Sequence, residues 1–142
     1  MSCFEEGSIT DEKHFILTGI YERLNIIYFT KDNIIYLWNY NTNDIITYNE
    51  ISSVISAIHI TKPKVRLFSD EISHIIVVAT NTNITILLVK QSENGTISII
   101  KSDFYIELEV NYIITCIVST SQRRIFLGSQ NNFLFELDYT VK

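Results

Sequence analysis

A short polar segment recurs in this chain at a spacing of about fifty residues. Its three copies share a hydroxyl residue, two polar residues, an asparagine and an apolar residue; they are Thr30–Ile34, Thr80–Ile84 and Ser129–Phe133. The asparagines stand at positions 33, 83 and 132, so the two spacings are 50 and 49 residues. Because asparagine tolerates the positive φ of a tight turn, each copy predicts a hairpin between two strands.

The residues around these turns favour strands. The 142 residues include 26 Ile, 8 Val, 13 Thr, 8 Tyr, 8 Phe and 1 Trp, but only 2 Ala. β-Branched and aromatic side chains pack well on pleated surfaces and are poor helix formers. An apolar run such as Ile75–Ala79 predicts a strand covered on both faces. The ten predicted strands are Leu24–Thr30, Ile34–Asn39, Ile45–Asn49, Val54–Ile60, His74–Thr80, Ile84–Lys90, Thr96–Lys101, Ile113–Ser119, Arg124–Gly128 and Phe133–Tyr139.

Four short strands in about fifty residues are typical of a β-propeller blade. We therefore predict an all-β fold, an incomplete β-propeller of about three four-stranded antiparallel blades, with the last blade lacking a strand. A generic β-sandwich is the alternative, but it does not predict a fixed spacing. A polar N-terminal tail, 1–13, precedes the partial propeller, 14–142, whose blade-like units are 24–50, 54–102 and 113–139.

The expected number of blades is too small to close a propeller, which needs about four to eight. Stacked repeats bury their faces only against neighbours. We therefore expect two bare outer faces, and the remainder of a propeller, from this or another chain, as a partner. Whether the sequence is a whole, a truncated or a split gene product stays open.

Charge and cysteine usage narrow the class of protein. The chain has 11 Lys and Arg against 16 Asp and Glu, a net charge of −5, which argues against nucleic acid as a partner. The aromatic residues Tyr36 and Trp38 are accordingly interpreted as packing between blades.

The acidic start, Met1–Glu6, lacks the features of a signal peptide, and Cys116 lies in an apolar run. We expect a buried free thiol and a reducing compartment.

The residue patterns of common active sites and cofactor sites are missing. The three histidines, His14, His59 and His74, are not at metal-ligand spacing from each other or from a cysteine. With only four glycines and no Gly-x-Ser-x-Gly, the chain offers neither a phosphate-cradling loop nor a nucleophile elbow. We expect no enzyme, catalytic residue, cofactor, metal or small-molecule substrate.

One local basic cluster stands out in this acidic chain. Lys62, Lys64 and Arg66 lie close together in the connection Thr61–Ser73, which begins beside the single proline, Pro63. The cluster is either a solvated loop or a contact surface for an acidic segment of a partner. It is the only candidate contact site that the sequence offers.

Several segments, in the same order, resemble one known family. They are Thr30–Tyr40, which ends Leu-Trp-Asn-Tyr; Ile60–Lys64, with Lys-Pro-Lys; His74–Thr80; and the strand pair Ile113–Ile117 and Arg124–Gly128, followed by Phe133–Tyr139. They are similar to segments of the large inner-ring scaffold nucleoporins, which have an N-terminal β-propeller followed by an α-helical solenoid. The resemblance covers roughly residues 16–139.

This resemblance implies a structural scaffold component of the nuclear pore complex. It implies no catalytic activity, a location at the nuclear envelope and contacts with other nucleoporins. The short polar loop Gln91–Gly95 has no amphipathic face, which argues against direct membrane contact. A cytosolic β-propeller-like adaptor unrelated to the pore is the alternative, and an enzyme is a third interpretation.

Overall fold

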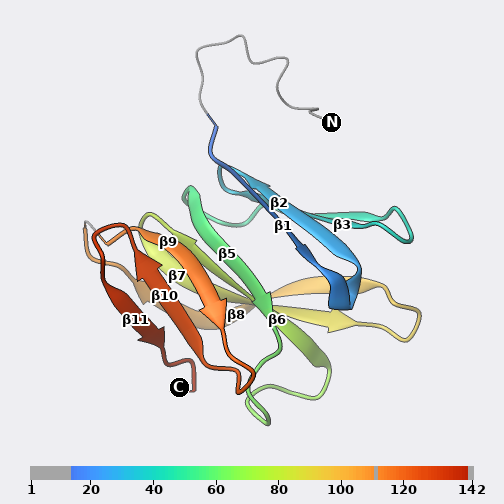
Figure 1. Cartoon of the computed structure of the whole chain (residues 1–142). Coiled ribbons are helices and arrows are strands. Elements are labelled where there is room, and N and C mark those ends of the chain that lie inside the picture. Colours follow the sequence, from blue (N-terminus) through green and yellow to red (C-terminus); the bar gives the residue numbers. More distant parts are fainter. Residues whose placement is uncertain (1–13, 111, 141–142) are drawn as a thin grey trace.

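Three antiparallel sheets make up the computed structural model, which describes residues 14–110 and 112–140 (Figure 1). In each sheet the strands follow one another in chain order. The predicted all-β fold of three antiparallel sheets, the last of them with three strands, is confirmed. The first two sheets have four strands each, and the three sheets do not close into a ring. The expected tail, 1–13, lies outside the described residues. The strands are β1 (Ile16–Tyr21), β2 (Ile26–Lys31), β3 (Ile34–Asn39) and β4 (Ile45–Tyr48); β5 (Ile55–Thr61), β6 (Ile72–Thr80), β7 (Asn83–Gln91) and β8 (Ile97–Glu107); and β9 (Ile114–Ser119), β10 (Ile125–Ser129) and β11 (Leu134–Leu137).

The first sheet starts earlier than the unit 24–50. Strand β1 was not among the predicted strands, and a 3-10 turn, η1 (Glu22–Leu24), joins it to β2. Gly19 weakens the strand pattern of β1, and it leaves room for Tyr28, because a Cβ at this position would lie 2.3 Å from the end of the Tyr28 ring. The first repeat is therefore a complete four-stranded sheet.

The repeated turn forms a hairpin in all three copies, but asparagine does not always supply the positive φ. The left-handed residues are Asp32 in the first copy, at 57°, and Asn132 in the third, at 70°. The side chain of Asn33 instead donates to the carbonyl of Ile51 at 2.8 Å. In the second copy the hydroxyl of Thr80 accepts a hydrogen bond from the backbone N–H of Asn83 at 3.1 Å. One motif thus makes the same hairpin through different local bonds.

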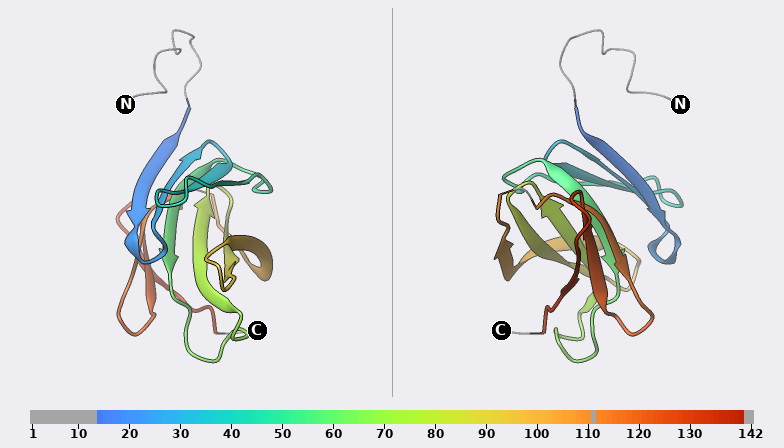
Figure 2. Two further views of the ribbon diagram at one scale, coloured as in Figure 1. Left: turned by 90° about the vertical axis from the view of Figure 1, so that its right-hand side faces the viewer. Right: turned by 60° about the vertical axis from the view of Figure 1, so that its left-hand side comes forward.

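The second sheet lies between the other two and carries the core. Alternate residues of β6 point to opposite faces, as the pleat requires. Ile76 and Val78 pack in one apolar cluster with the first sheet, while Ile75 and Val77 pack in another with the third sheet. The prediction that the apolar run in this strand would be covered on both faces is confirmed. Figure 2 shows that the loop between β5 and β6 and the end of the third sheet lie at the same end of the molecule.

The two outer sheets each leave one face without a described neighbour. On the first sheet Ile20 is 56% and Ile45 64% exposed, and on the third Val118 is 54% and Leu134 74% exposed. Tyr36 and Trp38 do not pack between the described sheets, and their packing against a further blade stays a prediction. Both are half-buried on this outer face, because their neighbours Ile35 and Leu37 take the inward positions of β3.

Cys116 is exposed rather than buried, which corrects the expectation drawn from its apolar surroundings. It lies on β9 directly opposite Gly128 of β10, and the inward positions belong to Ile114 and Ile117. An apolar run cannot by itself reveal which of its residues face the core.

The pair of Cys116 and Gly128 gives a packing test. A Cβ on Gly128 would lie 2.7 Å from the Cys116 sulfur, and the exposed thiol must leave its present rotamer to make room. Gly128→Ala is therefore expected to lower the free energy of unfolding by about 0.5–1.5 kcal/mol. Cys116→Ala in the same chain removes the collision and should restore most of the loss. Urea unfolding of the two single variants and the double variant measures the coupling. If the two effects simply add, the close approach is not the cause.

Candidate functional site

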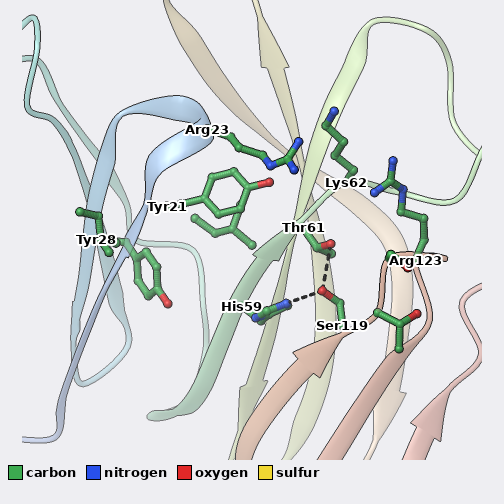
Figure 3. Close-up of a pocket in the computed structure, with 12 residues that line it drawn as sticks. Tyr21, Arg23, Tyr28, His59, Thr61, Lys62, Ser119 and Arg123 are labelled. Atoms are coloured by element: carbon green, nitrogen blue, oxygen red, sulfur yellow. Dashed lines mark hydrogen bonds between the residues drawn. The ribbon is translucent and has the colours of Figure 1, made fainter.

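A pocket of about 310 Å³ lies where the first strands of the three sheets end (Figure 3). Strands β1, β5 and β9 run in the same general direction, with β5 against both of the others (Figure 1). Their carboxyl ends therefore come together, and each contributes residues to the pocket wall: Tyr21 from β1, Thr61 from β5 and Ser119 from β9. The site is built from all three repeats.

Three cationic side chains line this pocket, and each follows the first strand of a different sheet. They are Arg23 in η1, Lys62 directly after β5, and Arg123 in the turn between β9 and β10. Figure 3 shows their charged ends on the same side of the pocket. We call Arg23, Lys62 and Arg123 the cationic triad.

Local backbone structure fixes two members of the triad. Asn25, with φ of 57°, closes the short turn that carries Arg23, and its N–H donates to the carbonyl of Glu22 at 3.0 Å. Arg123 itself has φ of 69°, in a turn held by hydrogen bonds that end on Thr120. A non-glycine residue in this region is uncommon and persists only where its surroundings require it.

The positive charges of the triad have no anionic partner among the residues that the structure describes. The ion pairs found there involve other cations, as in Lys90 with Glu71 and Arg124 with Glu136, each at 2.8 Å. The field of the triad reaches its neighbours. Arg23 and Arg123 lower the pKa of Tyr21 against the larger effect of burial, which raises it.

A small hydrogen-bond network forms the inner wall. The Ser119 hydroxyl donates to Thr61 Oγ1 at 3.2 Å and lies 2.8 Å from His59 Nε2. Burial lowers the pKa of His59, so this imidazole is neutral at pH 7. Because the Ser119 hydroxyl gives its one proton to Thr61, it accepts the bond from His59 Nε2, so His59 is not placed as a base for this serine. No carboxylate among the described residues orients His59 either.

The predicted basic cluster is split by the fold. Lys62 joins the pocket, whereas the amine of Lys64 lies 5.1 Å from the ring centre of Tyr139, and Arg66 is exposed on the loop. The Tyr139 hydroxyl accepts from the Lys64 N–H at 3.1 Å and donates to the Arg123 carbonyl at 2.8 Å. Tyr139 thus ties together the two loops that carry Lys62 and Arg123. The sequence patterns indicated Lys62 but missed Arg23 and Arg123.

A second feature is an aromatic cluster at the edge of the third sheet. The ring centres of Phe133 and Phe135 lie 5.5 and 5.6 Å from that of Tyr112. Strand β11 is the outermost strand of its sheet, and Phe133 just before it is exposed. This edge offers unpaired backbone groups beside an apolar surface.

The described residues contain no group of three or more His, Cys, Asp or Glu side chains placed to hold a metal ion. Within the same residues there is no helix long and apolar enough to cross a membrane.

Comparisons with known proteins agree on one family. A family model described as Nup133 N terminal like matches residues 5–142. The chain is 29% identical over 132 residues to a probable nucleoporin, C890.06, of Schizosaccharomyces pombe, and 27% identical over 127 residues to nuclear pore complex protein Nup154 of Drosophila melanogaster. These alignments cover 90% and 87% of this chain but only 10% and 9% of the relatives.

Solved structures include a similar fold. The crystal structure of the Chaetomium thermophilum Nup170 NTD–Nup53 complex matches with a TM-score of 0.73 and 26% identity. The match covers 82% of this chain and 17% of that one. The chain therefore spans about a tenth of the curated relatives and a small part of the solved one.

Proposed function

This chain belongs to the nucleoporin family with a Nup133-like N-terminal domain, and from this membership we propose that it is a structural component of the nuclear pore complex. It acts there through protein–protein contacts and supports nucleocytoplasmic transport as part of the scaffold. The observation that carries the proposal is the family match over residues 5–142, which includes almost the whole chain.

Other nucleoporins are the proposed partners. The solved protein of similar fold was crystallised as a complex of Nup170 with Nup53, so a related fold does contact another nucleoporin. The bare outer faces and the aromatic cluster of Tyr112, Phe133 and Phe135 supply apolar surface for such contacts. We propose that the remainder of a propeller covers these faces, because two of the three sheets already show the four-stranded form.

We also propose that the chain has no enzymatic activity. Family membership argues against an enzyme, and the pair of His59 and Ser119 lacks an orienting carboxylate among the described residues. The cytosolic adaptor unrelated to the pore is not favoured, since the family and the relatives in fly and fission yeast carry nucleoporin names.

Localisation tests the proposal. The gene tagged at its own locus is expected to give a fluorescent rim at the nuclear envelope that coincides with a known pore marker. The control is a chain carrying Ile76→Asp, which places an unpaired charge in the buried core and should lose the rim together with the fold. A diffuse cytosolic signal from the intact tagged protein would support the adaptor and remove the pore function.

A further inference from the structure

We propose that the pocket between the ends of β1, β5 and β9 binds a phosphoryl group carried by a segment of a protein partner. The inference rests on the proposed function for the expectation that the partner is a protein. The pocket, the cationic triad and its surroundings support the chemistry of the ligand independently of any location in the cell.

The unpaired positive charges of the cationic triad favour an anionic ligand. The protein has 16 acidic residues, more than enough to neutralise its 11 basic ones. Even so, Arg23, Lys62 and Arg123 line one side of a single pocket without an acidic partner among the described residues. Bringing three like charges together is unfavourable unless a ligand neutralises them. The shared field of the triad lowers the pKa of His74, for which burial is the larger cause.

A phosphoryl group fits this site better than a carboxylate. It carries between −1.5 and −2 charges at pH 7 and presents three acceptor oxygens, whereas a carboxylate carries one charge and two oxygens. The two guanidinium groups offer forked donors and the lysine a mobile point charge, the combination by which proteins bind phosphate. The hydroxyl residues Thr120 and Ser121 also line the pocket.

The remaining wall favours a phosphoryl group attached to a polypeptide. Tyr21, Tyr28 and Ile60 line the same pocket as the triad. Free phosphate would leave this apolar wall without contacts. Residues flanking a phosphorylated serine or threonine can pack on it, which adds affinity that free phosphate lacks.

The test is a titration of the full 142-residue chain, labelled with ¹⁵N and followed by two-dimensional NMR. Three probes are used in parallel: a short peptide with one phosphoserine between apolar residues, the same peptide with serine, and inorganic phosphate. The phosphopeptide is expected to shift the amide signals of Arg23, Lys62, Arg123 and Ser119. Its affinity should exceed that of inorganic phosphate and of the serine peptide by about tenfold or more.

Variants identify the groups responsible. Arg23→Gln with Arg123→Gln removes two charges from the triad and should weaken phosphopeptide binding at least tenfold. The matched control, Lys64→Gln with Arg66→Gln, removes two charges from the neighbouring loop and should change binding less than twofold. If the triad variant loses its native spectrum, Lys62→Gln alone replaces it, with an expected loss of about fivefold or more.

Three outcomes would overturn the inference. Equal weakening by the triad and control variants means that net charge alone attracts the peptide. Equal affinity for phosphate and phosphopeptide means that the site takes free anions. Binding to phosphatidylcholine vesicles with 5% phosphoinositide, but not to the phosphopeptide, means that a lipid is the ligand. A chain that binds the phosphopeptide without reaching the nuclear rim would contradict the proposed function and leave this site intact.

Discussion

Replacing Ile76 by alanine will lower the free energy of unfolding by about 2–5 kcal/mol. Ile76 is 0% exposed and lies in β6, inside the sheet that the other two sheets cover. It packs in the cluster shared by the first and second sheets, so the lost carbons leave a cavity lined from both sides. Close-packed surroundings relax only in part, which adds a cavity penalty to the lost hydrophobic transfer energy.

The matched control is Ile45→Ala, which makes the same change at a residue that is 64% exposed on the outer face of the first sheet. It should change stability by less than about 0.5 kcal/mol in the isolated chain. Urea unfolding followed by tryptophan fluorescence measures both variants, since the single Trp38 lies in β3 of the first sheet. Similar losses for Ile76→Ala and Ile45→Ala would contradict the assignment of the core to the second sheet.

The stability of the protein is expected to fall by about 2 kcal/mol between pH 7.5 and pH 5.0 because of His74. This residue is buried, with Nδ1 3.0 Å from the Ser73 hydroxyl and Nε2 without a described partner. Burial is the main cause that lowers its pKa from 6.5 to about 4, and the charges of Lys62, Arg23 and Arg123 act in the same direction. Its ring also meets the ring of Tyr21 edge-on, with centres 5.2 Å apart.

The sign of this pH dependence follows from the number of protons that the folded and unfolded chains bind. Between pH 6.5 and about 4 the unfolded chain takes up a proton on His74 that the folded chain does not, so lowering the pH favours unfolding. Above pH 6.5 both states are neutral at this residue and the effect vanishes. Below about pH 4 both are protonated and the loss is complete.

His74→Leu separates this contribution from the rest. Leucine cannot be protonated and leaves no unsatisfied imidazole nitrogen, so the variant should lose about 2 kcal/mol less than the wild type between the two pH values. A smaller dependence will remain, because burial also lowers the pKa of His59. Urea unfolding at pH 7.5 and 5.0 gives the comparison. Identical pH dependence in the two proteins would mean that His74 titrates normally in the fold.

Periodicity predicted the fold because it depends on local chemistry. The repeated turn marks three hairpins, and the apolar run of β6 marks the strand covered on both faces. The predictions that were wrong concern features that depend on contacts with other strands. Strand β1 was not predicted, because Gly19 interrupts the strand pattern of its residues. The strand nevertheless forms, with Gly19 packed against Tyr28. Cys116 faces outward because the register in which β9 pairs with β10 determines which residues of β9 face the core. That register cannot be read from the apolar run alone.

The pocket was only partly visible in the sequence because its cations lie far apart in the chain. Lys62 was found through its neighbours Lys64 and Arg66, which the fold directs elsewhere. One sequence pattern could have identified all three cations. In each repeat a cation follows the first strand within a few residues: Arg23 after β1, Lys62 after β5 and Arg123 after β9. With β1 unrecognised, only two of the three positions could have been aligned.

The common direction of β1, β5 and β9 has a thermodynamic consequence. A ligand that needs the ends of all three strands binds only when the three sheets are docked together. It therefore stabilises that docking by an amount that grows with the ligand concentration relative to its Kd. Occupancy and assembly become linked quantities, so that a kinase or phosphatase acting on the partner would also set how firmly these blades hold to one another.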